Sequence, residues 1–239
     1  MSDFVVIIPA MNEQASLAKV LLDIRQYHNC DVIVVDDGSI DNTALVARQH
    51  GAIVLPHVIN MGAWRATQTG IRYALQKEYD NVVTLDADGQ HNALDIEKLI
   101  VASQLGNDLV IGSCTSRGSA GRHVVWKTIK KLTGLPVSDL TSGFRCYSKS
   151  AMQVLVSKQA SMFEYQDVGV LLMLKHLNMK CTEVAVSMDE RQDGISRIFN
   201  SWRAVIKYLL YTFILSVTKV SPISAKTYHN KLTSGGNLD

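Results

Sequence analysis

The sequence has few cysteines, little net charge and no long apolar run. Its 239 residues include four cysteines without CxxC or CxH spacing, namely Cys30, Cys114, Cys146 and Cys181. We therefore expect buried thiols in a reducing cytoplasm, and neither a disulfide framework nor a zinc site. The net charge of +2 gives no general argument for nucleic acid as a partner.

A membrane-spanning segment is also missing from the pattern. A helix that crosses a bilayer needs roughly 18–20 apolar residues. The nearest stretch, YLLYTFILSV at 208–217, is about half as long. The first residues, MSDFVVIIPA, lack the basic region and the long apolar stretch of a signal peptide.

Several catalytic and nucleotide-binding signatures are absent. The chain has no GxGxxG and no GxxxxGKS/T, and where a Rossmann protein would carry its glycines it has IIPAMNE at 7–13. A dinucleotide cofactor and a P-loop NTPase are therefore not expected. HExxH and GxSxG are missing too.

What the sequence does contain is an alternation of short apolar runs and amphipathic stretches. The runs expected as strands lie at 4–8, 31–35, 52–56, 82–85 and 108–112. Helical spacing relates Leu17, Val20, Leu21 and Ile24, and further helices are expected at 41–50 with Asp41 as N-cap, at 63–76 and at 95–105. This alternation predicts an α/β fold with a Rossmann-like, mostly parallel sheet covered by helices on both faces.

The pattern is looser after residue 112. We expect a helix near 167–177, a strand at 182–188, a loop at 189–197 and a last helix from about 201 to 218. The predicted organisation is a single catalytic domain over 1–200, an amphipathic helix at 201–219 and a flexible tail at 220–239.

Two acidic clusters follow expected strands, DDGS at 36–39 and DADGQ at 86–90. In a parallel sheet ligands bind at the carboxyl ends of the strands, so this placement favours a site. Asp86, Asp88 and Gln90 offer the hard oxygen ligands that suit Mg²⁺ or Mn²⁺, if a turn at 87–89 brings them together. The alternative is ordinary turn chemistry, in which Asp and Gly favour tight bends.

The first cluster has its own pair of interpretations. Asp36 or Asp37 can accept from a ribose hydroxyl or a base N–H, as acids do at this place in other nucleotide folds. The alternative is a turn at Gly38 with helix capping by Asp41. That alternative does not explain why two acids directly follow a buried strand.

Six segments in order resemble the GT-A family-2 glycosyltransferases, in particular the dolichyl- or polyprenyl-phosphate sugar synthases and related bacterial polysaccharide enzymes. They are IIPAMNE, VVDDGSIDNT, NMGAWRATQTGI, LDADGQH, DLTSGFRCYSK and ERQDGISR, and they cover about residues 3–200. The resemblance implies a GT-A fold and a divalent metal on the diphosphate of a UDP- or GDP-sugar. It also implies site roles. The nucleotide-sugar residues would be Pro9, Asn12, Glu13, Asp36, Asp37, Gly62, Arg117, Arg191, Ser196 and Arg197, and the metal residues Asp86, Asp88 and Gln90.

The nucleophile decides which residues are catalytic. A phosphate acceptor is already an anion, whereas a sugar hydroxyl needs a carboxylate base within about 3 Å. Asp167 is the first candidate base, and its alternative role is charge complementarity at a helix N-terminus. Asp139 is the second candidate, with a plain turn acid as its alternative. Arg145 of TSGFR is expected near phosphates or the acceptor.

The sequence thus predicts an inverting, metal-assisted glycosyltransferase that acts on a polyprenyl-phosphate, lipid-linked or polysaccharide acceptor. We expect a cytoplasmic protein whose segment 201–219 contacts the inner face of the membrane or a partner, with docking on the domain as the alternative. The alternative functions are a nucleotidyltransferase and a non-catalytic nucleotide-sugar-binding subunit of a polysaccharide assembly. The oligomeric state is left open.

Overall fold

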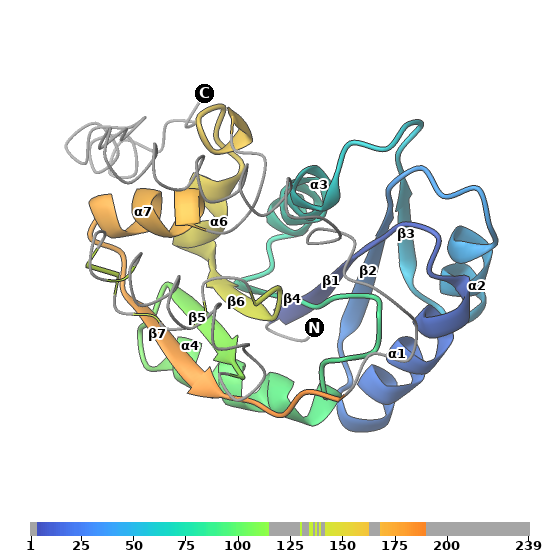
Figure 1. The fold of residues 1–239 in the computed structure, drawn as a ribbon, viewed down its shortest axis with the longest axis horizontal. Helices are drawn as coiled ribbons and strands as arrows, with labels where there is room; N and C mark the ends of the chain where they lie inside the picture. Colours follow the sequence, from blue (N-terminus) through green and yellow to red (C-terminus); the bar gives the residue numbers. More distant parts are fainter. Residues whose placement is uncertain are drawn as a thin grey trace.

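A mixed sheet forms the centre of the protein (Figure 1). The computed structural model describes residues 4–114, 130, 134, 135, 137, 139, 142–162 and 168–189. In chain order, the strands in these ranges are β1 (Phe4–Ala10), β2 (Asp31–Asp36), β3 (Ile53–Pro56), β4 (Asn81–Thr84), β5 (Leu109–Ser113), β6 (Arg145–Ser148) and β7 (Cys181–Ala185). They lie in the order β3-β2-β1-β4-β6-β5-β7. All neighbours are parallel except β6, which runs antiparallel to both β4 and β5.

Helices cover both faces of this sheet, as the sequence predicts. One face packs against α1 (Gln14–Tyr27), α2 (Thr43–Gln49) and α4 (Ile96–Gln104), which follows the short 3-10 helix η1 (Ala93–Asp95). The other face packs against α3 (Ala63–Gln76), α6 (Lys149–Leu155) and α7 (Val168–His176), with η3 (Ala160–Met162) beside them. Figure 1 shows α3, α6 and α7 above the sheet, α1 and α4 below it, and α2 beside β3.

The buried strands alternate their side chains between these two cores. On β1, Val5 and Ile7 belong to the α3 side, whereas Val6 and Ile8 belong to the α1 side. A strand buried on both faces has apolar residues at every position, which is why these strands are continuous apolar runs in the sequence. The result is a three-layer α/β/α arrangement with β1 near its centre.

Helix α3 lies directly on β1 because its buried face is made of small residues. Ala66, Gly70 and Ala74 are buried, as the sequence predicts for this ridge. A Cβ on Gly70 would lie 2.6 Å from Cγ2 of Ile7, so the absence of a side chain permits this close approach. The bounds of α3 match the predicted helix at 63–76.

Two elements and one helix start differ from the prediction. Strand β6 and helix α6 lie in the stretch that the sequence shows as loose. Helix α2 begins at Thr43, so its N-cap is Asn42 and not Asp41. Asp41 still serves the start of the helix, because its Oδ1 accepts from the backbone N of Thr43 at 2.9 Å. The expected helix at 201–219 and the tail at 220–239 lie outside the described residues.

The four cysteines are free, but only Cys146 is fully buried. Burial raises the pKa of the Cys146 thiol to about 12. The other three are half-buried, so the expectation of four buried thiols is right for one of them. No helix in the part of the chain that the structure describes is long and apolar enough to cross a membrane.

Replacing Gly70 by Ala tests the contact between α3 and β1. Alanine favours a helix, but its Cβ would collide with the Ile7 side chain in a close-packed core. We expect Gly70→Ala to lower the free energy of unfolding by about 2 kcal/mol, measured by denaturant titration. Ile7→Ala removes Cγ2, Cδ1 and Cγ1, which lie 2.6, 3.1 and 3.2 Å from that Cβ, so the loss should shrink in this background. Purely additive effects in the double-mutant cycle would contradict the contact.

Candidate active site

The order of the strands defines one edge of the sheet as the candidate site. From β1 the chain moves outward through β2 to β3, and α3 then returns it to β4 on the other side of β1. Ligands of open α/β sheets bind at the carboxyl ends of the strands where the order reverses in this way. The acidic clusters after β2 and β4 therefore flank the end of β1, where Pro9 is in register with Val35.

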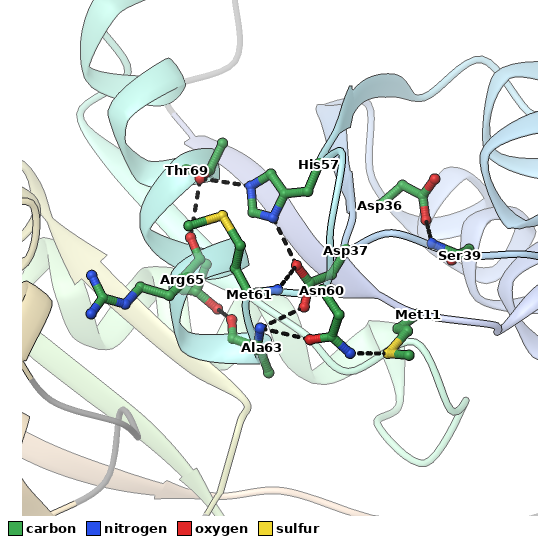
Figure 2. A network of polar contacts seen from close by, with 12 residues as sticks. Met11, Asp36, Asp37, Ser39, His57, Asn60, Met61, Ala63, Arg65 and Thr69 are labelled. Carbon is green, nitrogen blue, oxygen red and sulfur yellow. Dashed lines mark hydrogen bonds and ion pairs between the residues drawn. The ribbon is translucent and has the colours of Figure 1, made fainter.

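The two acids of the first cluster point to opposite sides of the chain (Figure 2). Asp36 is the last residue of β2 and is 7% exposed. Its Oδ1 accepts from the backbone N of Ser39 at 3.2 Å, and its Oδ2 has no hydrogen-bond partner among the described residues. Asp36 is thus able to accept one more hydrogen bond, which fits the predicted contact with a nucleotide.

Asp37 uses both carboxylate oxygens inside the protein. Oδ1 contacts Nδ1 of His57 at 2.7 Å and accepts from the backbone N of Met61 at 2.8 Å. Oδ2 accepts from the backbone N of Gly62 at 2.7 Å. On its other side His57 contacts Oγ1 of Thr69 on α3 at 3.0 Å. Figure 2 shows this network closing the loop that precedes α3.

The structure therefore separates two acids that the sequence treats as a pair. Successive residues of an extended chain point to opposite sides, so only one of them faces a given region. The carboxylate of Asp37 and the backbone N of Gly62 hold the 57–62 loop, and the expected roles of both residues in the nucleotide pocket stay predictions. Spacing did not reveal His57 as a partner, because it lies 20 residues beyond Asp37.

Asn12 and Glu13 join the loop after β1 to the loop after β2. The backbone N of Asn12 donates to Oγ of Ser39 at 2.9 Å, and its Oδ1 accepts from the backbone N of Ile40 at 2.9 Å. The backbone N of Glu13 donates to Oγ1 of Thr43 at 2.8 Å. These contacts hold both loops next to Asp36. Direct roles for Asn12, Glu13 and Pro9 in nucleotide binding stay predictions.

The second cluster forms the predicted turn. Residues 87 and 88 make the turn, and Gly89 has a φ of 73°, which L side chains rarely adopt. Oδ1 of Asp88 accepts from the backbone N of Gln90 at 3.1 Å. Asp88 is half-buried and Gln90 is buried. Asp88 therefore stabilises the turn through Oδ1, and this contact does not prevent its carboxylate from also binding a metal ion.

Asp86 is the most constrained acid of this cluster. Its Oδ2 lies 3.1 Å from Nε2 of His91, whose side chain is 1% exposed while that of Asp86 is 47% exposed. Nδ1 of His91 is buried and has no hydrogen-bond partner in the described part of the chain. Because a carboxylate oxygen is the acceptor, Nε2 of His91 is the donor in this contact. The His91 ring packs on Phe144, with centroids 5.0 Å apart.

Gly143 of the TSGFR segment closes the other side of Asp86. A Cβ at Gly143 would lie 2.5 Å from Oδ1 and 2.6 Å from Oδ2 of Asp86, so a larger residue would displace the carboxylate. Oγ1 of Thr84 donates to the carbonyl oxygen of Gly143 at 2.7 Å and holds this turn in place. The backbone of Gly143 thus takes the space beside the acid, a role that the motif alone did not reveal.

Arg145 lies inside the fold. It is 0% exposed, and its Nε donates to the carbonyl oxygen of Ser142 at 2.8 Å. In the sheet it is in register with Thr84 on β4 and Ile111 on β5. The buried guanidinium supports the 142–144 turn, and the expected place of Arg145 near phosphates or the acceptor stays a prediction.

The remaining predicted residues are only partly described. Asp139 is buried, and its backbone N donates to Oε1 of Glu183 at 2.7 Å. Its role as a base stays a prediction. The other expected site residues lie outside the described residues, and they are Arg117, Asp167, Arg191, Ser196 and Arg197.

A divalent metal fits the residues present at the end of β4. Within the described ranges no group of three or more His, Cys, Asp or Glu residues forms a complete metal cage. Mg²⁺ commonly takes one or two protein carboxylates and completes its shell with water and substrate phosphates. Asp86, whose side chain is half-exposed, and Asp88, which is half-buried, offer two carboxylates of that kind.

Comparison with known proteins identifies the class to which this site belongs. The model of the family described as Glycosyl transferase family 2 matches residues 5–156. The chain belongs to this family and is a glycosyltransferase. Membership favours this prediction over the nucleotidyltransferase and over the non-catalytic subunit that the sequence left open.

Two relatives act on lipid phosphates according to their names. The undecaprenyl-phosphate mannosyltransferase of Micrococcus luteus is 31% identical, in a match that covers 80% of this chain and 86% of that protein. The UDP-N-acetylglucosamine–dolichyl-phosphate N-acetylglucosaminyltransferase of Methanococcus voltae is 30% identical, in a match that covers 72% of this chain and 79% of that protein.

A solved structure confirms the predicted GT-A class of α/β fold. Glucosyl-3-phosphoglycerate synthase from Mycobacterium tuberculosis, in complex with Mn²⁺, UDP and phosphoglyceric acid, matches with a TM-score of 0.66. The match covers 89% of this chain and 78% of that one at 19% identity.

Gly143→Ala tests whether the backbone of this turn presents Asp86. The added Cβ must displace the carboxylate, so we expect metal-dependent binding of UDP or GDP to weaken about tenfold by calorimetry. Gly106→Ala is the control, because nothing lies within 4 Å of its Cβ, and its positive φ adds a backbone strain that Gly143 does not have, so a purely general destabilisation should appear there too. Unchanged nucleotide affinity in a folded Gly143→Ala protein would refute this role.

Asp37→Asn and Asp36→Asn should separate the two acids of the first cluster. Asp37→Asn removes a buried carboxylate that accepts from His57 and from two backbone N–H groups and can place an amide NH2 against those donors, so we expect a loss of about 3 kcal/mol in unfolding free energy. Asp36→Asn should cost much less stability and should act mainly on nucleotide affinity. Denaturant titration with nucleotide calorimetry compares the two variants, and equal stability losses would contradict the assignment.

Proposed function

We propose that this glycosyltransferase moves a sugar, with inversion, from a UDP- or GDP-sugar to a polyprenyl-phosphate or another lipid-linked acceptor with the help of Mg²⁺ or Mn²⁺. The observation that carries the proposal is the half-exposed carboxylate of Asp86 at the end of β4, held between Gly143 and His91. The names of the Micrococcus luteus and Methanococcus voltae relatives support a lipid phosphate as acceptor.

The donor diphosphate is proposed to lie between the ends of β2 and β4. A divalent ion held there by Asp86 and Asp88, with Gln90 nearby, would neutralise the charge that develops on the leaving diphosphate. Asp36 keeps one carboxylate oxygen for a hydroxyl or N–H of the nucleoside. The contacts of Asn12 and Glu13 keep the loop around Asp36 in place.

The acceptor determines whether a base is required. A phosphate oxygen attacks the anomeric carbon as an anion, and the bond from that carbon to the diphosphate oxygen breaks on the opposite side. No proton has to be removed from such a nucleophile. In that case neither Asp139 nor Asp167 acts as a general base. If the acceptor is a sugar hydroxyl, one of these two carboxylates must reach its proton.

The contact of segment 201–219 with a membrane is part of the same proposal. A lipid-linked acceptor lies in a bilayer, so the enzyme has to approach its surface. The aromatic and basic residues of this segment, Trp202, Lys207, Tyr208, Tyr211 and Lys219, suit the interfacial region of a membrane.

Asp88→Ala tests the donor side directly. Wild-type protein should show a thermal shift with UDP or GDP that requires Mn²⁺, because the ion links the carboxylates to the diphosphate. We expect Asp88→Ala to lose the Mn²⁺-dependent part of the shift and to transfer sugar at least about a hundredfold more slowly, as expected when a metal ligand is removed.

Asp80→Ala is a matched control at the opposite end of the same strand. Asp80 precedes β4, is exposed, and lies 3.5 Å from Nζ of Lys149, so its loss should leave the shift intact. A wild-type protein that binds no nucleotide in the presence of Mn²⁺ or Mg²⁺ would overturn the proposed function.

A further inference from the structure

Asp95 is a buried acid that the proposed reaction does not use. It ends η1 just before α4 and accepts three hydrogen bonds. Its Oδ2 accepts from the backbone N of Ser187 at 2.7 Å and from Oγ of Ser187 at 2.8 Å. Its Oδ1 lies 2.7 Å from Nζ of Lys98. Burial alone would raise the pKa of Asp95, but the hydrogen bonds from Lys98 and Ser187 outweigh it and leave the pKa lowered.

The residues that Asp95 holds lie against the acidic motif. Ser187 comes two residues after the end of β7. Met188 forms an antiparallel bridge with His91, and the backbone N of Asp189 donates to the carbonyl oxygen of Gln90 at 2.9 Å. The segment 187–189 therefore runs beside the residues that follow Asp86 and Asp88.

We propose that Asp95 is a positioning residue, which latches segment 187–189 beside Gln90 and His91 and thereby sets the orientation of the Asp86 carboxylate. The mechanical path is short. Asp95 fixes Ser187, the next two residues pair with Gln90 and His91, and His91 donates to Asp86 at 3.1 Å. The functional part of this inference rests on the proposed metal–diphosphate site.

The latch also joins two parts of the chain that were expected to serve one reaction. Asp189 leads directly into the segment ERQDGISR, whose Arg191 and Arg197 were predicted to lie near phosphates or the acceptor. Because Asp189 is hydrogen-bonded to Gln90, that segment departs from the donor end of β4. Asp95 thus ties the start of the predicted acceptor segment to the acidic motif.

Strand β7 does not depend on this acid. Its five residues pair in parallel register with β5, from Leu109 opposite Cys181 to Ser113 opposite Ala185. The backbone N of Val186 also donates to the carbonyl oxygen of Ser113 at 3.1 Å. Loss of Asp95 should therefore release residues 187–189 while β7 stays in the sheet, which makes the effect local and measurable.

Hydrogen–deuterium exchange of Asp95→Ala tests the latch without any ligand. We expect the amides of Ser187 and Asp189 to exchange at least about tenfold faster than in wild type, with the β7 amides unchanged. Lys98→Ala is the control, because it removes the exposed ion-pair partner of Asp95 and a 3.5 Å contact with the carbonyl oxygen of Ala185, but leaves both hydrogen bonds from Ser187 to Asp95. Retained protection of the Asp189 amide in Asp95→Ala would overturn the proposal.

Mn²⁺ binding measured by electron paramagnetic resonance, with UDP or GDP present, tests the positioning role. We expect Asp95→Ala to bind Mn²⁺ about tenfold more weakly and Lys98→Ala to match wild type, as for outer residues that orient metal ligands. Wild-type Mn²⁺ affinity in a folded Asp95→Ala protein would refute the role, since a purely structural acid would lower only the melting temperature.

A second variant and a comparison with wild type separate failure of the latch from failure to fold and from failure of the proposed function. If Asp95→Ala does not fold, Ser187→Ala removes one of the two Ser187 donors and should give a smaller change in the same direction, about threefold. No change in exchange or in Mn²⁺ affinity for Ser187→Ala would then count against the latch. If wild type binds no Mn²⁺ with any nucleotide, the proposed function fails, and the exchange experiment still decides whether Asp95 holds 187–189.

Discussion

The candidate site depends on side-chain oxygens that accept hydrogen bonds from the backbone N–H groups of the loops after the parallel strands. A loop that leaves a sheet edge must find partners for these donors, because an unpaired buried N–H is costly. Asp37 serves the loop before α3, Thr43 and Ser39 serve the loop after β1, and Asp95 serves the chain after β7. Once these loops are fixed, Asp36 and Asp86 are left at the edge in defined orientations.

Much of the fold could be predicted from the sequence because its central strands are buried on both faces. Such strands appear as uninterrupted apolar runs, and the small residues of α3 mark a helix that packs closely on β1. Strand β6 gave no such signal. It is four residues long, contains the buried Arg145, and runs against its neighbours, so neither its length nor its composition distinguished it from a loop.

The location of the candidate site could be predicted from the sequence, but the contacts that each of its residues makes could not. The acids of 36–37 and 86–88 follow strands, and the rule for parallel sheets places them together. The sequence did not show that the Asp37 carboxylate would contact His57, or that the backbone of Gly143 would lie directly beside the Asp86 carboxylate. Both facts arise from contacts between distant segments, which local patterning does not encode.

The reversed direction of β6 has a consequence for how such an enzyme can diversify. Because β5 and β6 are antiparallel neighbours, with the backbone N of Gly112 bonded to the carbonyl oxygen of Phe144, the long connection between them starts and finishes at one point of the active edge. When the two ends of a connection are pinned side by side, the entropy of closing it grows only with the logarithm of its length. Added length in this connection therefore costs the sheet little, whereas Leu135 and Val137 within it are buried in the core and tolerate less change. Changes in the connection between β5 and β6 could in this way alter which acceptor is bound while the sheet stays the same.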